Sequence, residues 1–433
     1  MSEPASAFPS ATISPLDLAR LLPVPAASAW ADHLDRYGPS PAPAGCLFDA
    51  VEAAGLRGRG GAAFPTATKP RAVAAGAGRR RPVVVANGTE GEPASAKDKV
   101  LLQVAPHLVL DGIDLVAGLL GASEAHLCVD RAWPDVAAAV ERAIAERARS
   151  GRAHRTGGRL PRVQVHAAPD RYVAGEETAL VHWLNGGEAR PMFVPPRPFE
   201  RGVRGRPTLT SNVETYAQIA LVARFGVDGY RSVGTPDAPG TMLLTVSGAV
   251  AAPGVCEAAG GTDLTGVLQA AGGPVDGVQA VLIGGYFGTW IPGGAVGQVR
   301  LDPASLGRFG AAIGCGVVGV LPVHACPLQE VARITRWMAG ENAGQCGPCV
   351  HGLPAVADAV ERAATGRSIT PHQILDLLEL VRGRGACRHP DGLARFVESS
   401  VRVFADHVAA HRRHGACPAQ APLFPVPATG AWR

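Results

Sequence analysis

The sequence predicts an α/β layer fold, followed by a small β-rich domain and a C-terminal bundle of four helices. First, apolar runs such as 82–86 alternate with helical patterns such as 108–120 between Cys46 and about Phe225, which is typical of layered strands and helices. Second, a glycine- and proline-rich break at 234–240 precedes short apolar strands. Third, apolar residues recur at helical spacing through the last third. A length of 433 residues suits two or three domains.

Composition narrows the class of protein. With 47% hydrophobic and 18% charged residues, the chain has the composition of a folded, soluble protein. The net charge of +4 is small, and the arginine run 79–81 has no interleaved aromatic residues, so we interpret the run as a solvated loop and expect no nucleic-acid partner. Nine unevenly spaced cysteines and no charged-plus-apolar leader predict a cytoplasmic location. The longest uncharged stretch, 309–325, is shorter than the roughly 20 residues of a bilayer span, so we expect buried strand and loop there and no direct membrane span.

Breaks in composition divide the chain into six predicted parts. The first 43 residues are rich in Ala, Pro and Ser, and their prolines prevent long helices, so we expect an arm without chemistry. In the β-rich part we expect strands at 241–250 and 281–285 and a helix at 263–271. The predicted parts are an N-terminal arm at 1–43, an α/β domain at 44–235, a β-rich domain at 236–300, a linker strand and loop at 301–325, a helical domain at 326–412 and a C-terminal tail at 413–433.

Four amphipathic helices are predicted in the helical domain. Residues 370–373 form a capping box, Gly383 can end the helix that follows it, and Asp391 can cap the next helix. The apolar spacing places one buried face on each helix. These faces include Leu328, Val331, Ile334 and Trp337 on the first helix, Leu353, Val356 and Val360 on the second, and Phe396, Val397, Val401, Phe404 and Val408 on the last.

Three cysteines of the helical domain have metal-ligand spacing. Cys346 and Cys349 form a C-x2-C pair in the first connection, and Cys387 lies in the third, so the three thiols can meet at one end of the bundle. A cubane iron–sulfur cluster uses four protein ligands, usually thiolates, and a C-x2-C-x2-C run needs a cysteine where this chain has Ala343. The site therefore looks like an iron–sulfur site that lacks one ligand.

The first of four candidate binding segments in the α/β domain is a glycine loop at 55–69. Gly58, Gly60 and Gly61 let the backbone approach a ligand closely and point N–H groups at phosphate, and Lys69 adds a positive charge. The spacing matches neither the G-x-G-x-x-G dinucleotide fingerprint nor the phosphate loop with G-K-S/T. A simple turn is the alternative.

The second segment, 83–98, is a buried strand that leads into a polar loop. Asn87, Glu90 and Glu92 are therefore expected near the carboxyl end of the strand, where open α/β sheets bind ligands. A surface turn with ordinary solvated carboxylates is the alternative.

The third and fourth segments are 172–180 and 205–215. The paired carboxylates Glu176 and Glu177 are either binding groups or a capping turn of a helix that begins near Glu177. The run from Asn212 to Thr215 is either part of a binding site or only the start of a helix.

In this order and at this spacing, the four segments resemble the NADH-binding flavoprotein subunit of respiratory complex I and of related NAD-linked hydrogenases and formate dehydrogenases. The resemblance covers roughly residues 50 to 410. It implies a Rossmann-like α/β domain for FMN, a β-grasp domain of the soluble-ligand-binding type and a helical iron–sulfur domain. In that family NADH gives a hydride to the flavin, and electrons leave one at a time through the cluster.

The resemblance also implies roles for individual residues. The glycine loop and Lys69 are expected to meet the phosphate of FMN, and Phe64, Glu92 and Glu177 are expected to bind the dinucleotide. The implied flavin contacts are Gly58, Gly60, Gly61, Lys69, Asn87, Glu90, Tyr172, Gly175, Glu176, Asn212 and Thr215.

Several positions depart from the family pattern. The loss of a negative charge beside the flavin should shift its potential, and the loss of aromatic partners should weaken the binding of NADH. The departures are Ala63, Ala67 and Pro70 for two glycines and a tryptophan, Thr89 for an aspartate, Val194 and Arg197 for a lysine and a phenylalanine, and Ala72 for a second aromatic residue.

For the cluster, the family's four cysteines correspond to Ala343, Cys346, Cys349 and Cys387. The implied site is a [4Fe–4S] cluster with an atypical fourth ligand, a three-iron cluster, or no cluster. The alternative ligands are Asn342, Glu341 or Cys326 for iron, and His389 or His351 for a Cys3His zinc site.

Three functions follow from this interpretation. The first is an FMN-dependent NADH dehydrogenase within a heteromeric complex, which passes electrons to an iron–sulfur partner or other redox subunits. The second is an FMN electron-transfer subunit that a ferredoxin-like partner reduces in place of NADH, which the departures Val194, Arg197 and Ala72 favour. The third is a cofactor-free interaction scaffold.

Overall fold

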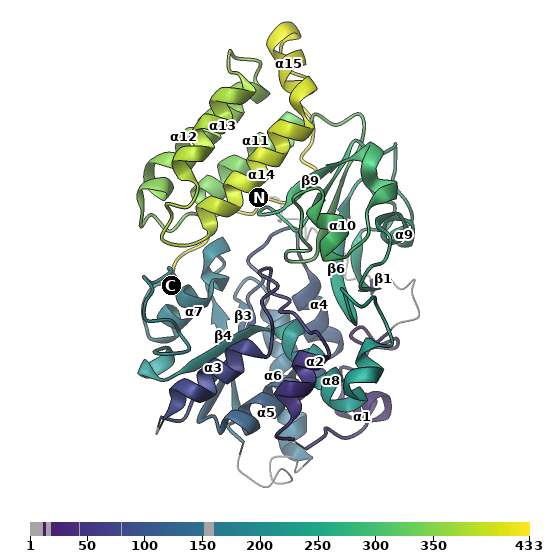
Figure 1. Ribbon diagram of the computed structural model, residues 1–433, viewed down its shortest axis with the longest axis vertical. Coiled ribbons are helices and arrows are strands. Elements are labelled where there is room, and N and C mark those ends of the chain that lie inside the picture. The colour runs from purple at the N-terminus through teal and green to yellow at the C-terminus, as the bar shows by residue number, and fades with distance from the viewer. Residues whose placement is uncertain (1–11, 14–18, 43, 79, 151–159) are drawn as a thin grey trace.

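A four-stranded parallel sheet forms the centre of the α/β part of the chain (Figure 1). The computed structural model describes residues 12–13, 19–42, 44–78, 80–150 and 160–433, so much of the predicted arm at 1–43 and Arg79 of the arginine run lie outside the described residues. The sheet order is β4-β3-β2-β5. Its strands are β2 (Val83–Gly88), β3 (Glu124–Asp130), β4 (Val163–Ala168) and β5 (Thr208–Asn212). The strand predicted at 82–86 is confirmed as β2.

Helices cover both faces of this sheet. Side chains alternate along a strand, so Val84 and Ala86 pack with α5 and α8, whereas Val83 and Val85 pack with α7 on the other face. The helix predicted at 108–120 is confirmed within α5. The helices of this part are α1 (Trp30–Tyr37), α2 (Leu47–Ala53), α3 (Thr68–Ala77), α4 (Lys97–Val104), α5 (Pro106–Leu120), α6 (Pro134–Arg149), α7 (Glu177–Leu184) and α8 (Val213–Arg231), with 3-10 turns at Tyr172–Gly175 and Val203–Gly205.

A second, mixed sheet follows in the chain. Its order is β1-β7-β6-β10-β8-β9, and β10 runs parallel to β6 but antiparallel to β8. The predicted strands at 241–250 and 281–285 and the helix at 263–271 are confirmed as β6, β8 and α9. The segment predicted as a linker strand and loop supplies β10. The elements are β1 (Thr12–Ile13), β6 (Thr241–Gly248), β7 (Gly254–Ala259), α9 (Leu264–Ala270), β8 (Ala280–Ile283), β9 (Thr289–Pro292), a 3-10 turn at Gly293–Gln298, α10 (Pro303–Gly307) and β10 (Val317–Leu321).

The last third is helical, with one more helix than predicted. The helix predicted to carry both Phe396 and Val408 is broken at Phe404, whose φ of −108° and ψ of 25° leave the helical range. The capping box at Thr370 is confirmed, because Thr370 and Gln373 exchange side-chain and backbone hydrogen bonds. The helices are α11 (Pro327–Gly340), a π-helical turn at Pro348–Gly352, α12 (Leu353–Ala364), α13 (Pro371–Val381), α14 (His389–Val403) and α15 (Ala405–His414).

The prediction that Asp391 caps a helix is wrong. The helix α14 begins two residues earlier, at His389, so Asp391 lies inside its first turn. The Asp391 carboxylate accepts hydrogen bonds from the Gly383 N–H at 2.7 Å and from Arg388 at 3.0 Å. An acidic residue is favourable there without being the cap, because the first turn of a helix carries partial positive charge.

The chain end from Gly415 to Arg433 forms no helix or strand and runs back to the α/β part. Figure 1 shows the C-terminus beside α7. Phe424 is buried in the core of the helical third, and further along the tail the guanidinium of Arg171 lies 4.0 Å from the ring centre of Trp432. The tail therefore connects the helical third with the α/β part.

Among the described residues, no single helix has the length and apolar character to cross a membrane. The pair α4 and α5 meets those criteria only when taken together, and the two helices are bent by 93° at the break between them.

Candidate functional site

The four candidate segments meet at the carboxyl edge of the parallel sheet, between β2 and β5. In chain order the strands build outward from β2 through β3 to β4, and the chain then crosses to place β5 on the other side of β2. This is a topological switch point, the place where open α/β sheets bind ligands. Asn87 of β2 and Asn212 of β5 are paired in the register of the two strands there.

Asn212 joins the second and fourth segments. Its side-chain amide donates hydrogen bonds to the Asn87 carbonyl at 3.2 Å and to the Asp98 carboxylate at 2.5 Å, and its carbonyl oxygen caps α8 through the Glu214 N–H at 3.0 Å. Lys97 is buried and lies 2.7 Å from Asp98 and 2.8 Å from Glu214. Burial raises the pKa of Asp98, and the positive charge of Lys97 opposes that shift. The floor of the site is thus a buried ionic network.

Asn87 joins the second and third segments. Its amide donates to the Gly175 carbonyl at 2.7 Å, and its oxygen accepts from the Thr89 hydroxyl at 2.7 Å. A Cβ atom on Gly175 would lie 2.6 Å from the Thr89 hydroxyl oxygen, so only glycine fits this contact. Thr89 thus uses its hydroxyl group within the protein, where the family has a charged carboxylate.

The glycine loop lies against the fourth segment. The Arg59 N–H donates to the Thr215 hydroxyl at 2.9 Å, and a Cβ atom on Gly60 would come within 3.2 Å of Asn212. Gly61 has a φ of +103°, which is costly for other residues. Among the described residues, the N–H groups of Gly60 and Gly61 have no hydrogen-bond acceptor. These unpaired donors in an accessible loop fit a phosphate group, which accepts several hydrogen bonds.

Lys69 and Glu177 form an ion pair at the side of the site. Their charged atoms are 3.0 Å apart, and Lys69 also donates to the Thr210 carbonyl at 3.3 Å. Both side chains are about one-third exposed, at 35% and 32%. The pair is therefore open to a ligand, and an incoming phosphate can compete with Glu177 for Lys69. Phe64 of the glycine loop is 46% exposed and offers an aromatic face.

Two of the predicted carboxylates serve as helix caps. Glu90, which has a φ of +42°, accepts hydrogen bonds from the N–H groups of Asp98 and Lys99 at the start of α4. Glu176 accepts from the N–H groups of Thr178 and Ala179 at the start of α7. The capping turn considered for Glu176 is therefore confirmed, and both carboxylates shape the loops beside the switch point.

Glu92 is buried beside the site, with 7% of its surface exposed. Its oxygens accept hydrogen bonds from the Tyr286 N–H at 2.7 Å, the Tyr172 hydroxyl at 3.1 Å and the Ala94 N–H at 3.2 Å. Burial raises the pKa of Glu92 to about 7, and these three hydrogen bonds oppose the shift. Because Tyr286 belongs to the second sheet region, Glu92 joins the α/β part to its neighbour.

Tyr172 connects the site to the helical third. Its N–H donates to the Glu341 carboxylate at 2.9 Å, and Arg171 forms an ion pair with the same carboxylate at 3.1 Å. Glu341 is 1% exposed and ends α11, directly before the cysteine loop. The segment at 172–180 is therefore held against the loop that carries Cys346 and Cys349.

The three predicted metal-ligand cysteines come together. The sulfur atoms of Cys346 and Cys349 are 3.4 Å apart, and the Cys387 thiol interacts electrostatically with both and with Glu176. Although burial opposes it, the N–H groups of Ala386 and Cys349 lower the pKa of Cys346, which favours the thiolate that binds metals. Three thiols are the donor type that an iron–sulfur cluster uses, and Cys346 and Cys349 would have to move apart to bind two different irons.

The fourth corner has no cysteine, and most proposed substitutes are occupied. Ala343 is buried at 3% exposure, Asn342 makes hydrogen bonds to the Ala339 carbonyl and the Gly344 N–H, and Glu341 is paired with Arg171. Cys326 precedes α11, whose 14 residues span about 21 Å, so it lies at the opposite end of the helix from the cysteine loop.

The histidines proposed for a zinc site differ in their surroundings. His389 is buried, and its Nε2 donates to the Met338 carbonyl at 2.8 Å, so its buried Nδ1 is an acceptor without a hydrogen-bond partner among the described residues. His351 is exposed on the π-helical turn.

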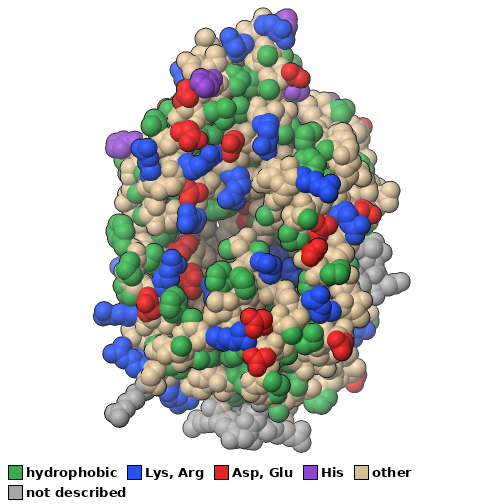
Figure 2. Space-filling model, in the orientation of Figure 1, with side chains coloured by type: hydrophobic (Ala, Val, Ile, Leu, Met, Phe, Trp, Pro, Cys, Tyr) green, Lys and Arg blue, Asp and Glu red, His purple; other side chains and the backbone are tan. Residues whose placement is uncertain are grey.

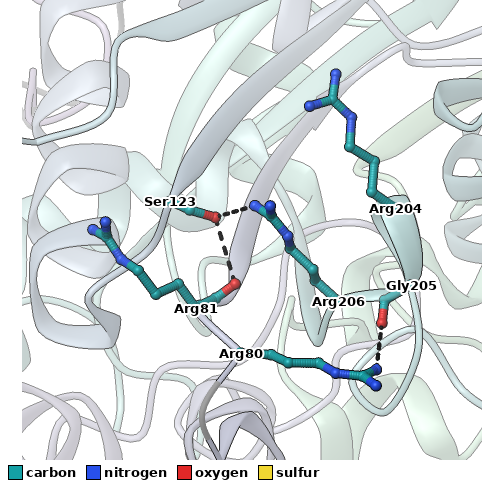
Figure 3. Close-up of a pocket in the computed structure, with 6 residues that line it drawn as sticks. All are labelled: Arg80, Arg81, Ser123, Arg204, Gly205 and Arg206. Atoms are coloured by element: carbon teal, nitrogen blue, oxygen red, sulfur yellow. Dashed lines mark hydrogen bonds between the residues drawn. The ribbon is translucent and has the colours of Figure 1, made fainter.

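A cavity of about 550 Å³ lies at the opposite edge of the sheet. Its lining residues, drawn in Figure 3, belong to the segments that directly precede β2, β3 and β5. Arg81 donates to the carbonyls of Gly121 and Ala122, and Arg206 donates to Ser123 and Glu124. These arginines are thus used in the protein itself, and the cavity is separate from the switch point.

The surface of the molecule is hollowed between the α/β part and the helical third, next to the predicted site (Figure 2). Figure 2 shows acidic and basic side chains mixed over the visible face, with a hollow at mid-height between the helical third and the α/β part.

The sequence analysis did not identify the buried charged residues that hold the site residues in position. Lys97, Asp98 and Glu214 form the buried ionic floor, and Arg171 holds Glu341. A local signal existed for Lys97 and Asp98, because charged residues directly after a buried strand and loop lie near the sheet edge. No local signal existed for Arg171, whose partner is 170 residues away.

The chain is similar to known flavoproteins along most of its length. Residues 51–221 match the Nuo51 FMN-binding domain, and residues 329–411 match the NADH-ubiquinone oxidoreductase-F iron-sulfur binding region. The F subunit of the NADH-quinone oxidoreductase of Mycobacterium tuberculosis is 33% identical over 388 residues, which cover 86% of each chain. The F subunit of the Escherichia coli enzyme is 30% identical, with 84% of each chain covered. A crystal structure of an NAD+-reducing [NiFe]-hydrogenase in the H2-reduced state matches 96% of this chain and 70% of its own, with a TM-score of 0.78 and 31% identity.

Proposed function

Because the chain belongs to the family of NADH-quinone oxidoreductase F subunits, we propose that it uses FMN to oxidise NADH and delivers the electrons to an iron–sulfur centre and a partner subunit. The observation that carries this proposal is the meeting of all four segments at the switch point between β2 and β5, next to the loop with Cys346 and Cys349. Bound FMN supplies the conversion from two-electron to one-electron transfer.

The residues of the site divide the work of holding the flavin. The unpaired N–H groups of Gly60 and Gly61 and the accessible ammonium group of Lys69 support a role in binding the phosphate. Asn87 and Asn212 hold the strand ends and loops at fixed positions through their amide hydrogen bonds. Glu90 and Glu176 act as positioning residues, because they cap α4 and α7.

Fewer of the residues that bind NADH in the family are present in this chain than in its relatives. Glu177 and Phe64 are accessible, whereas Glu92 is buried and supports the site from behind. In the segment where the family's phenylalanine is replaced by Arg197, Phe193 is 73% exposed and supplies an aromatic ring four residues earlier. We propose that Phe193 compensates for that loss.

The finer division of the fold is also a proposal. The packing of α11 on α12 and α14, with α13 between α12 and α14, supports a four-helix bundle at 326–412, to which α15 adds a fifth helix. We propose an FMN and NADH domain at 44–235 and a β-grasp domain that begins at 236. Because β10 lies between β6 and β8, this sheet extends through residues 301–325. The arm at 1–43 and the tail at 413–433 complete the proposed division.

The relatives indicate where such a protein works. They are named as subunits of NADH-quinone oxidoreductase and as a hydrogenase. We propose redox partner subunits that receive electrons from the end of the molecule that carries Cys346, Cys349 and Cys387, with the chain peripheral to any membrane component. A cytoplasmic location accords with this proposal.

Anaerobic purification with FMN tests the proposed function. We expect one flavin per chain, bleaching of its absorbance by NADH, and loss of flavin binding in Asn212→Ala. A protein that neither binds flavin nor is reduced by NADH contradicts the proposal. Reduction by a reduced ferredoxin but not by NADH supports the second function, which the departures at Ala72, Val194 and Arg197 favour. A colourless protein supports the scaffold.

Iron, sulfide and EPR measurements on the same sample identify the cluster. We propose that Cys346, Cys349 and Cys387 hold three irons and that the fourth is bound by solvent or by a non-cysteine ligand. A signal of a three-iron cluster in the oxidised sample, a signal of a cubane in the reduced sample, or zinc without iron selects among the three possibilities.

A further inference from the structure

A second cluster of metal-binding side chains lies at the far end of the helical third. The sulfur atoms of Cys326 and Cys417 and a ring nitrogen of His411 all lie within 4.8 Å of one another. Cys326 precedes α11, His411 lies in the last turn of α15, and Cys417 follows in the tail. Cys326 and His411 are each 2% exposed, and Cys417 is partly exposed.

The distances in this cluster match those of ligands that share one zinc ion. The His411 Nε2 atom lies 3.6 Å from the Cys326 sulfur and 3.2 Å from the Cys417 sulfur. With a zinc–sulfur bond of about 2.3 Å, a zinc–nitrogen bond of about 2.05 Å and tetrahedral angles, a sulfur and a nitrogen on one zinc are about 3.6 Å apart. The three side chains can therefore bind zinc with only small movements.

The orientation of His411 also suits a metal ligand. Its Nδ1 lies 3.2 Å from the Ala363 carbonyl, which can only accept a hydrogen bond, so Nδ1 carries the proton and Nε2 has the free electron pair. The Cys417 N–H donates to the same Nε2 atom at 3.3 Å, which shows that Nε2 is an acceptor, and a bound metal would take the place of this hydrogen bond. Metal-binding histidines typically donate their other N–H to a carbonyl or carboxylate in this way.

The backbone around the cluster brings Cys417 back over α15. Gly415 ends α15 with a φ of +87°, which turns the chain towards His411. A Cβ atom on Gly366 would lie 3.0 Å from the His411 carbonyl oxygen and 3.1 Å from the Ala416 nitrogen, so glycine at 366 lets the turn pack closely. At Cys326, the N–H donates to the Gln420 side chain at 2.6 Å.

We propose that Cys326, His411 and Cys417 bind one zinc ion, with water as the fourth ligand, and that this ion fastens the C-terminal tail to the helical third. Two thiolates and a neutral imidazole are donors that zinc prefers, and two thiolates balance the charge of the ion where it is buried. This site is independent of the iron–sulfur site, because the roughly 21 Å length of α11 separates their loops.

The segment of the tail that follows Cys417 packs along α11, and this is the segment that the ion would hold in place. Gln329 donates to the Cys417 carbonyl, Glu330 accepts from the Leu423 N–H at 2.8 Å, and Trp337 donates to the Pro427 carbonyl at 2.8 Å. The tail thus follows α11 from its first turn to its last. A zinc ion at the start of this path fixes the register of the whole tail.

The test begins with the full-length protein, purified with its iron–sulfur site loaded. Metal analysis should give about one zinc per chain in addition to iron, and X-ray absorption at the zinc edge should show two sulfur ligands at about 2.3 Å and one nitrogen at about 2.0 Å. A zinc bound in the iron–sulfur loop would show three sulfur ligands and would overturn the assignment. Mononuclear iron at Cys326 and Cys417 would also overturn it.

Variants separate the two sites. Cys417→Ser and His411→Gln should each lower zinc content at least tenfold and make the tail accessible to protease, whereas Cys387→Ser should keep its zinc. Cys46→Ser, at an exposed cysteine outside both sites, is the matched control and should behave as the wild type. Zinc that persists in Cys417→Ser, or a Cys326–Cys417 disulfide in peptides mapped without reduction, contradicts the proposal. The X-ray absorption spectrum of the wild type identifies the zinc ligands even if a variant fails to fold.

Discussion

The buried carboxyl group of Glu92 offers a quantitative test of how the α/β part is joined to the second sheet. Glu92 is 7% exposed, and its oxygens accept hydrogen bonds from Tyr172, Ala94 and Tyr286. Burial raises its pKa from 4.5 to about 7 despite these hydrogen bonds. The substitution Glu92→Gln keeps the shape of the side chain but removes its ability to ionise.

The expected effect follows from proton linkage. Between pH 4.5 and pH 7 the folded protein keeps a proton that the unfolded chain releases, so the free energy of unfolding of the wild type falls as the pH rises. A pKa raised from 4.5 to about 7 corresponds to about 3 kcal/mol. Glu92→Gln should therefore gain about 3 kcal/mol over the wild type on going from below pH 4.5 to above pH 7. Burial raises the pKa of the neighbouring Tyr172 and Cys315, so both stay protonated over this range.

Urea unfolding of the flavin-free protein, followed by circular dichroism at several pH values, measures this difference. Flavin is left out because a bound ligand adds its own pH-dependent stabilisation. Glu141→Gln, an exposed carboxylate on α6, is the matched control and should give a flat difference between variant and wild type. A flat difference for Glu92→Gln as well would refute the reasoning, since it would mean that Glu92 ionises alike in the folded and unfolded states.

Three further changes test other parts of the site. Arg171→Met leaves the Glu341 carboxylate buried without its cation and should cost about 3 kcal/mol in urea unfolding, whereas Arg412→Met on the exposed end of α15 should change little. Asn212→Ala removes the amide that joins β5 to the buried Asp98, so the dissociation constant for FMN, measured by quenching of flavin fluorescence, should rise at least tenfold; unchanged affinity would contradict the assigned role. Ala343→Cys completes the family's cysteine set, and iron analysis with EPR should show a complete cubane that resists loss of iron in air; unchanged iron content and spectra would place the missing ligand elsewhere.

Features with a local cause were predictable from the sequence. Asn212 and Glu177 begin helices as their positions suggested, and the Thr370 capping box forms because its partners are three residues apart. The place of the second segment was predictable too, since polar loops after buried parallel strands lie at the carboxyl edge of the sheet. The glycine loop at 55–69 follows the helix α2, so only the resemblance to the family indicated that it belongs with the other segments.

The rest depends on contacts between distant segments, which leave little local trace. The position of Glu92 after a strand indicated a ligand-binding residue, but it gave no sign that Tyr286, almost two hundred residues away in the chain, donates a hydrogen bond to the same carboxylate. Cys326 looked like a spare cluster ligand, yet α11 separates it from the cysteine loop. Asp391 failed as a cap because α14 continues two residues further towards the thiol of Cys387.

Arg171 bears on the order in which the molecule assembles. Its guanidinium group is paired with Glu341, donates to the Gly430 carbonyl and stacks on Trp432, so one side chain of the α/β part receives both the start of the cysteine loop and the end of the chain. These partners are synthesised well after residue 171, and domains generally fold from the N-terminal end during synthesis. We therefore expect the cysteine loop to dock onto an α/β part that has already folded, and the tail to pack against Arg171 last.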